Sequence, residues 1–359
     1  MRTIVLKKEH SPRERGVMHG KTFGGDIEKL ADIRLFLASK ISGLSHNELL
    51  SYASDHLPIL KSFDADLYEE LIGIAEGANV SAEKIVVLNH YTDIRDLGRS
   101  LGKKEKDVGD FDGGCTILYD KSESGPIFAQ TWDMHASSIP YVIMMWCPDG
   151  AGGGAWLLSL TGCLGMAGMS KARTFVGINN LTSKDATIGV VWSAIVRKAL
   201  KQSTAKESFD CVWNADFGSG HHYVVGDRES VFALESSGQT RKIISKGESL
   251  PYVHTNHCLD DEVAAHNLVP NGSTTYERQD IMVRLAKGDR IQNGDDAWKL
   301  LSNTEGFPRS ISTNMTTPEN QHGTATCAGL VMIPSTGIVK SAAGFTHASS
   351  PVDFSVLEQ

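Results

Sequence analysis

A change in the apolar pattern near residue 115 constrains the fold of this chain most strongly. Residues 20–100 carry apolar positions at helical spacing, which predicts a helical N-terminal third. After residue 115, short apolar runs of strand length follow one another, separated by Gly, Asp, Ser and Pro. Strands in runs, with helices in blocks, predict α+β layers rather than strict alternation of strand and helix.

Individual elements can be predicted from the same spacing. The helical third contains candidate helices at 26–41, 64–80 and 81–91, and further helical patterns follow at 185–202, 205–213, 274–288 and 295–303. Candidate strands cover 115–120, 126–134, 141–147, 155–160, 174–181, 222–227, 230–236, 326–333 and 337–343. The segment 99–114 is polar and rich in glycine, which predicts an exposed loop that ends at Cys115. The glycine cluster at 149–156 predicts a hairpin loop, since it lacks the context of a phosphate-binding turn.

Composition excludes several classes of partner. The chain has 359 residues and a formal net charge of −8, and it has no block of Lys and Arg, so we expect no nucleic-acid binding. The first apolar stretch is too short and too charged for a secretory signal, and no apolar run is long enough to span a membrane. We therefore expect a cytoplasmic protein that acts on a small molecule. The sequence leaves self-association open.

The cysteines and histidines do not predict a metal site. The six cysteines form no C-x-x-C pair, so neither a zinc knuckle nor a disulfide framework is indicated. Three close pairs could each offer two metal ligands: Asp133 and His135, His221 and His222, and His254 and His257. None has a third ligand at a recognisable zinc spacing, so we expect no metal and no other cofactor.

Cys115 follows two glycines and precedes a candidate strand, and this position suggests chemistry. If the chain is cut before Cys115, the new α-amine, with a pKa of about 7.7–8.0, can serve as the base for the thiol, whose pKa is about 8.5. One residue then supplies both nucleophile and base. Glycines lack a Cβ, so they can adopt backbone conformations that expose the Gly114 carbonyl carbon to the Cys115 sulfur.

The segment GGCTILYDKSESGPIFAQTWDMH resembles the processing site of the cysteine N-terminal-nucleophile (Ntn) hydrolases of the peptidase C45 type. This is the family of acyl-coenzyme A:6-aminopenicillanic acid acyltransferase. Its pattern is a (D/N)-G-C-T start followed, after a strand–turn–strand, by a W-D pair, which Trp132 and Asp133 match here. Weaker similarities are found in RGVMHG, EELIGIAEGANVSAEKIVVLN, FVGINN, HTNH and GFPRSIS.

The resemblance implies a four-layer αββα sandwich, the Ntn-hydrolase fold. It also implies self-cleavage between Gly114 and Cys115. Residues 1–114 would form a helical α chain and residues 115–359 a catalytic β chain. We expect the two pieces to remain associated as one globular unit.

The resemblance also assigns roles to residues. Cys115 would be the nucleophile, Asp133 would orient its amine, and the side-chain amide of Asn256 would donate to the developing oxyanion. Further residues would border the substrate: Trp132, His135, Asn179, Asn180 and His322. Penicillin-forming members carry two arginines where this chain has Thr313 and His322, and Arg309 lies close to the first position without aligning to it.

These departures favour hydrolysis of a small amide or N-acyl compound through a thioester acyl-enzyme. Acyl transfer to an amine, from an amide or from acyl-CoA, is the alternative. Two further classes stay open: a non-catalytic relative that binds a ligand, and a metal-dependent amidohydrolase, which would be sensitive to chelation and insensitive to loss of Cys115. The sequence does not identify the amide or the extent of processing.

Overall fold

Two β-sheets lie face to face in the computed structural model, which describes residues 1–102, 114–148, 150–288 and 290–359. The nine-stranded sheet has the order β1 (Arg2–Val5), β4 (Val142–Cys147), β5 (Ala155–Leu160), β6 (Ala167–Ser170), β7 (Phe175–Ser183), β8 (Gly220–Gly226), β9 (Val231–Ser236) and β10 (Arg241–Ser245), with β12 (Asn267–Leu268) paired to β7. The six-stranded sheet has the order β11 (Tyr252–His254), β2 (Gly114–Ser122), β3 (Gly125–His135), β13 (Thr324–Ile333), β14 (Ile338–Ala343) and β15 (Val352–Ser355). The strand pairs are antiparallel except β1 with β4.

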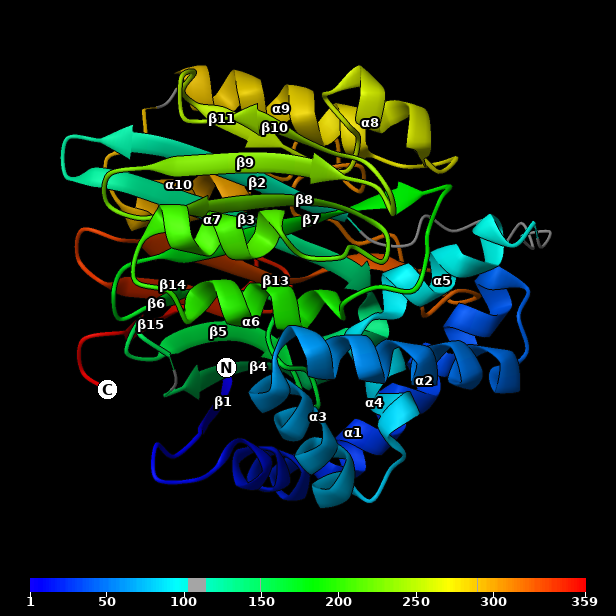
Figure 1. Cartoon of the computed structure of the whole chain (residues 1–359). Coiled ribbons are helices and arrows are strands. Elements are labelled where there is room, and N and C mark those ends of the chain that lie inside the picture. Colours follow the sequence, from blue (N-terminus) through cyan, green and yellow to red (C-terminus); the bar gives the residue numbers. More distant parts are fainter. Residues whose placement is uncertain (103–113, 149, 289) are drawn as a thin grey trace.

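Helices cover both outer faces of the two sheets. On the large sheet lie α6 (Trp192–Leu200) and α7 (Ala205–Trp213), and on the small sheet lie α9 (Thr275–Gly288) and α10 (Gly294–Leu301) (Figure 1). A short helix, α8 (Asp261–His266), follows β11. The order of the layers is therefore helix, sheet, sheet, helix, which is the predicted four-layer αββα sandwich.

The N-terminal helices pack together below the sheets in the view of Figure 1. They are α1 (Pro12–Ser42), α2 (His46–Phe63), α3 (Ala65–Ala78), α4 (Ala82–Asn89) and α5 (Tyr91–Ser100). Ser11 with Glu14 and Ser45 with Glu48 form capping boxes that begin α1 and α2. The predicted N-cap Ser81 accepts from the Lys84 N–H without a complete box.

Helix α1 begins well before its predicted start at residue 26. Its capping box places the start at Pro12, and Gly16 and Gly20 let its backbone lie against Gly73 and Gly77 of α3. A Cβ on Gly77 would lie 2.4 Å from a backbone oxygen of α1. Gly77 and Asn79 both indicate the end of α3 in the sequence. The helix ends at Ala78 with Asn79 as its C-cap, at a left-handed φ of 56°, whereas Gly77 lies within the helix.

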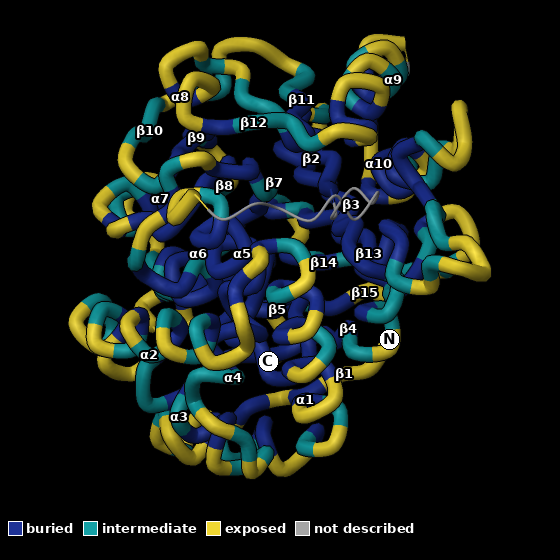
Figure 2. The backbone as a smooth tube through the Cα atoms, turned by 90° about the vertical axis from the view of Figure 1, so that its right-hand side faces the viewer, coloured by how far each residue is buried: buried dark blue, intermediate teal, exposed yellow. Residues whose placement is uncertain are grey.

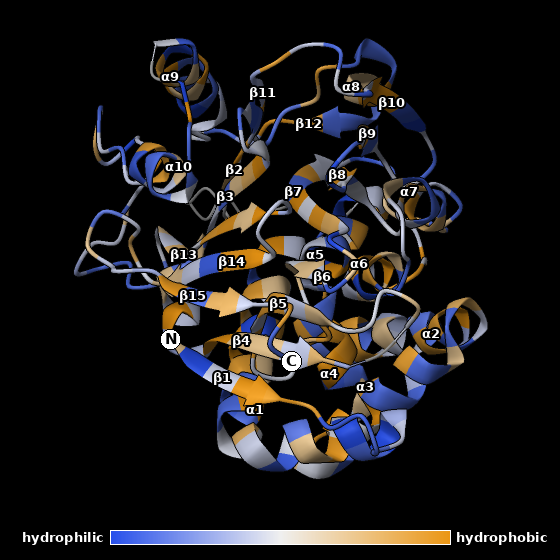
Figure 3. Ribbon diagram, turned by 90° about the vertical axis from the view of Figure 1, so that its left-hand side faces the viewer, coloured by the Kyte–Doolittle hydropathy of each residue, from blue (hydrophilic) through white to orange (hydrophobic). Residues whose placement is uncertain are grey.

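One apolar core cluster runs from the N-terminal helices through both sheets. Leu30 and Leu49 of the helices belong to it, as do Phe128 of the small sheet and Phe175 of the large sheet. Apolar stretches mark β7 and β13 in Figure 3, and the strands at the centre are buried in Figure 2. A second cluster lies beneath α9 and α10. No helix in the described ranges is long and apolar enough to cross a membrane.

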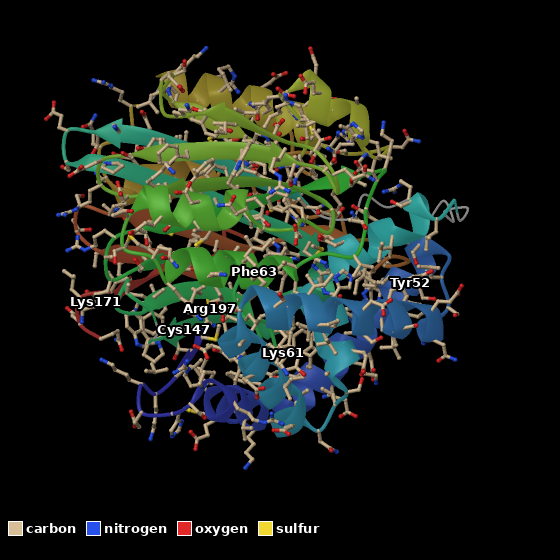
Figure 4. All side chains as sticks on the ribbon, viewed as in Figure 1. Tyr52, Lys61, Phe63, Cys147, Lys171 and Arg197 are labelled. Carbon is tan, nitrogen blue, oxygen red and sulfur yellow. The ribbon has the colours of Figure 1, made fainter. Side chains whose placement is uncertain are left out.

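Two contacts attach the predicted α chain to the predicted β chain. Strand β1 pairs in parallel with β4 at the edge of the large sheet. Arg197 of α6, labelled in Figure 4, donates from Nη1 to Glu70 Oε1 of α3 at 2.8 Å, and both side chains are buried. Such a buried pair is costly to break, because either partner alone would be an uncompensated charge.

Candidate active site

Cys115 lies near the start of β2, in a hairpin with β3. In this hairpin Cys115 is opposite Trp132, and Gly114 is opposite Asp133. The thiol is 5% exposed, and Cys115 lines a cavity between the two sheets. The register therefore brings the G-C-T and W-D motifs side by side.

Gly114 occupies a position where a side chain would not fit. A Cβ there would lie 2.7 Å from Arg278 Nη2 and 3.2 Å from Asn256 Oδ1. Gly114 does not have a left-handed φ, so close packing against Arg278 accounts for this glycine, rather than the strained conformation expected from the sequence. Gly113 and most of the predicted loop at 99–114 lie outside the described residues.

Arg278 of α9 holds the backbone around the thiol. Its Nη1 donates to the Cys115 carbonyl at 2.7 Å and to Thr116 Oγ1 at 3.0 Å. Its Nη2 donates to Asn256 Oδ1 at 2.8 Å, and that oxygen also accepts from the Cys115 backbone N–H at 2.8 Å. Arg278 is fully buried, so its charge acts in a medium of low dielectric constant.

The surroundings of Cys115 keep its thiol protonated in the uncleaved chain. Burial and, to a lesser extent, the nearby charge of Asp133 raise the pKa of Cys115 to about 12, although Arg278 acts to lower it. Burial also raises the pKa of Asp133 to about 6, against the charge of Arg278 and hydrogen bonds from Thr326 and Thr131. The sulfur is therefore not ionised in the uncleaved chain, and its proton has to be transferred when it attacks.

The cavity beside Cys115 has a volume of about 50 Å³. Apolar side chains form much of its wall: Trp132, Met134, Leu158, Met166, Ala167 and Ile178. An adjoining cavity of about 30 Å³ shares Thr92, Trp132, Met134, Met166 and Trp192 with it. The space suits a small, largely apolar group next to the thiol.

The structure brings together only some of the residues predicted from the sequence. Cys115, Trp132, Asp133 and Asn180 line the cavity, and Asn256 bonds to the Cys115 backbone. The three other predicted substrate contacts, His135, Asn179 and His322, are not among the lining residues.

Local geometry explains why these three side chains lie elsewhere. Asn179 and Asn180 are neighbours on β7, so they point to opposite faces of the sheet. Asn179 Oδ1 lies 2.7 Å from His222 Nδ1, away from the cavity. The His135 ring packs edge-on against Tyr91, and His322 Nδ1 lies 3.0 Å from Ser137 Oγ.

Several residues of the site are not indicated by the sequence. Arg278 contacts Cys115 from a position 163 residues further along the chain, within an ordinary amphipathic helix. Gln130 and Thr92, together with Trp192 and His221, also line the cavity. The described residues contain no group of three or more His, Cys, Asp and Glu side chains arranged to hold a metal.

Asp133 should make the stability of the uncleaved chain depend on pH. Its carboxyl has a pKa of about 6 in the folded chain and an ordinary value of 3.8, so between these pH values the unfolded chain releases the proton first and stability falls as pH rises. In a Cys115→Ala background, Asp133→Asn should gain roughly 2–3 kcal/mol relative to Asp133 between pH 4 and 7. Urea unfolding of both proteins at pH 4 and pH 7 measures this. The same difference in unfolding free energy at both pH values would contradict the prediction.

The fold and the buried cysteine at the start of an inner strand define an enzyme of the Ntn-hydrolase class. The sequence profile of the acyl-coenzyme A:6-aminopenicillanic acid acyl-transferase family matches residues 121–338, so the chain belongs to that family. The matched range includes Asp133 and Asn256 and begins just after Cys115. Membership makes the chain an enzyme of the amide hydrolase and acyltransferase class.

The chain is 24% identical over 310 residues, which are 84% of it and 82% of the relative, to the acyl-coenzyme A:6-aminopenicillanic-acid-acyltransferase 40 kDa form of Emericella nidulans. Among solved structures it is similar to penicillin V acylase of Agrobacterium tumefaciens (13% identity, 67% of this chain and 84% of that one, TM-score 0.44). It is also similar to a mutant of conjugated bile acid hydrolase of Clostridium perfringens (12% identity, 68% of this chain and 93% of that one, TM-score 0.48).

Proposed function

We propose that this protein is an autoprocessing cysteine Ntn amidohydrolase that cleaves a small amide or N-acyl compound. One observation carries the proposal: the buried Cys115 lines a small cavity together with Asp133, while Asn256 and Arg278 hold its backbone. A thiol with its pKa raised to about 12 needs a base close by, and an α-amine on the same residue supplies one.

The first step creates that amine. The Cys115 sulfur attacks the Gly114 carbonyl carbon, the peptide C–N bond breaks, and the Cys115 nitrogen takes up the proton. Water then cleaves the thioester, leaving a Gly114 carboxylate and a free α-amine on Cys115. Residues 1–114 and 115–359 stay together through β1, the Arg197–Glu70 pair and their shared core.

The second reaction uses the same sulfur on a substrate. Its α-amine takes the thiol proton, the thiolate attacks the amide carbon, and the departing amine receives that proton as the C–N bond breaks. Asp133 accepts hydrogen bonds from the α-ammonium and stabilises it. Water then releases the acid from the thioester and restores the thiol.

Asn256 is suited to steady the oxyanion. Its Nδ2 donates to the Asn180 carbonyl at 2.9 Å, and an amide nitrogen has a second hydrogen to offer. Asn256→Leu should therefore lower kcat by about 10²- to 10³-fold. Steady-state kinetics measures this, with Asn303→Leu in a loop outside the cavity as a control. An unchanged kcat in Asn256→Leu would remove Asn256 from the mechanism.

Intact-mass measurement and N-terminal sequencing test the proposal as a whole. We expect two chains, the second starting Cys-Thr-Ile, and a mass increase on the second chain when a slow amide substrate is quenched in acid. Chelators should leave the activity unchanged, since a metal-dependent amidohydrolase would lose it.

Acyl transfer is the second candidate, and the family match favours it. The thioester would then be captured by an amine in place of water. A labelled amide incubated with and without a competing amine separates the two reactions. If hydrolysis is the main reaction, free acid is the main product with and without the amine. If the amine-captured compound is the sole product, acyl transfer becomes the first candidate.

A further inference from the structure

Four polar atoms on the wall of the active-site cavity have no hydrogen-bond partner among the described residues. They are Asp133 Oδ2, Asn180 Oδ1, Trp192 Nε1 and His221 Nδ1, and each atom is buried. Buried polar atoms are nearly always paired, because leaving one unpaired costs free energy. Four around one small cavity therefore indicate a ligand with polar groups of its own.

Asp133 belongs to the chemistry of the thiol, whereas the other three lie on the large-sheet side. Asn180 lies on β7, His221 on β8, and Trp192 begins α6. Asn180 on β7 is opposite His221 on β8 in the sheet register. Cross-strand neighbours lie close enough for one ligand group to reach both side chains.

A buried carboxylate determines which ring nitrogen of His221 carries a proton. Its Nε2 lies 2.9 Å from Asp93 Oδ2, which also accepts from Thr92 Oγ1 at 3.0 Å. Burial acts to raise the pKa of Asp93, but the neighbouring His90 and His221 and the hydrogen bonds outweigh it and lower the pKa. An ionised carboxylate only accepts, so His221 Nε2 carries a proton, and in a singly protonated ring Nδ1 is an acceptor.

These atoms form a pattern that a ligand has to complement. Asn180 Oδ1 and His221 Nδ1 accept, whereas Trp192 Nε1 only donates. An alkyl group would leave all three unpaired. An amide group that donates its two N–H hydrogens to the first two and accepts at its oxygen from the third would satisfy the set, whereas a hydroxyl has one hydrogen and donates to one of the two acceptors.

We propose that Asn180, His221 and Trp192 form a specificity subsite that binds an N–H or O–H group on the acyl part of the substrate, away from the scissile bond. Asp93 is a positioning residue that holds the His221 tautomer. The subsite rests on the proposed amide chemistry and specifies its substrate class as short acyl groups with a polar, hydrogen-bond-donating end.

Matched p-nitroanilides test the subsite. Three series of short acyl chains end in hydroxyl, which donates and accepts, in methoxy, which only accepts, or in methyl. At the best chain length the wild-type protein, at a pH of about 8, should prefer hydroxyl over methoxy by about 10-fold in kcat/KM. Equal values at every chain length would overturn the subsite while leaving amide hydrolysis intact.

Substitutions connect the preference to its residues. His221→Met should abolish it, and His221→Gln should retain most of it, because Gln can donate to Asp93 and still offer an acceptor. Asn180→Leu removes an acceptor that has no partner in the described residues, so it should fold normally and reduce the preference by about 3-fold. Trp192→Phe should weaken the hydroxyl and methoxy series alike and spare the methyl series.

Two results decide the outcome when a variant or the reaction fails. If His221→Met does not fold, a full preference in Asn180→Leu, together with undiminished turnover of the hydroxyl and methoxy series in Trp192→Phe, overturns the subsite. If the wild-type protein turns over none of the compounds, calorimetry on Cys115→Ala decides. If the hydroxyl series binds about 10-fold more tightly than the methoxy series, the subsite is supported and the proposed catalysis is not. If the two series bind equally, both the subsite and the proposed catalysis are contradicted.

Discussion

Cys115→Ala is expected to remain one polypeptide of 359 residues and to lose amide turnover by on the order of 10⁴-fold or more. The substitution removes both the sulfur that would cut the chain and the proposed nucleophile of the processed enzyme. Intact-mass spectrometry measures the first effect, and single-turnover kinetics the second.

Cys211→Ala is the matched control, since this half-buried cysteine on α7 does not line the active-site cavity. It should process and turn over substrate like the wild-type protein. If active wild-type material yields only a Met1 or Arg2 start on sequencing, self-activation at Cys115 is excluded, whatever the activity of the alanine variant.

Arg278→Met should destabilise the folded chain by about 3 kcal/mol or more, because it leaves the Cys115 carbonyl and Asn256 Oδ1 without their buried donor. Processing should also slow, since Arg278 lowers the pKa of both Cys115 and Asp133. Urea unfolding in a Cys115→Ala background measures the stability, and the appearance of the second chain over time measures the processing.

Arg309→Met provides the comparison for Arg278→Met. Arg309 forms an exposed ion pair with Glu277, and such pairs contribute about 1 kcal/mol or less. Arg278→Lys should fall between the two, because lysine keeps the charge and loses the planar fork that reaches two acceptors. If Arg278→Met is no less stable than Arg309→Met, Arg278 does not hold the site together.

The layers of this fold could be predicted from the sequence because they depend on local periodicity. Strands β2, β3 and β7 were predicted within a few residues, as were α7 and α9. The short strands β6 and β12 were not, since two to four residues contain too little pattern. The start of α1 was placed too late, although Ser11, Pro12 and Glu14 form a local signal for it; what no local rule contains is the contact of its glycines with α3.

The same reasoning applies to the site. Cys115 and Asp133 belong to one hairpin, so a short motif contains both and can be recognised. Arg278 reaches Cys115 from a distant helix, and Asn180 faces the cavity while Asn179 does not. These contacts depend on how the layers pack together. A single sequence therefore indicates which residues could take part in catalysis, but it does not show which of them lie next to one another.

The parallel pairing of β1 with β4 has a consequence for a protein cut at residue 114. Main-chain hydrogen bonds of β1 would hold the smaller piece to the edge of the large sheet. The buried ion pair of Glu70 with Arg197 would hold it at a second point. Separating the two pieces would break the pairing of β1 with β4 and would leave the charges of Glu70 and Arg197 without their partners. Cleavage after residue 114 would therefore break one peptide bond, and we expect the two pieces to unfold together.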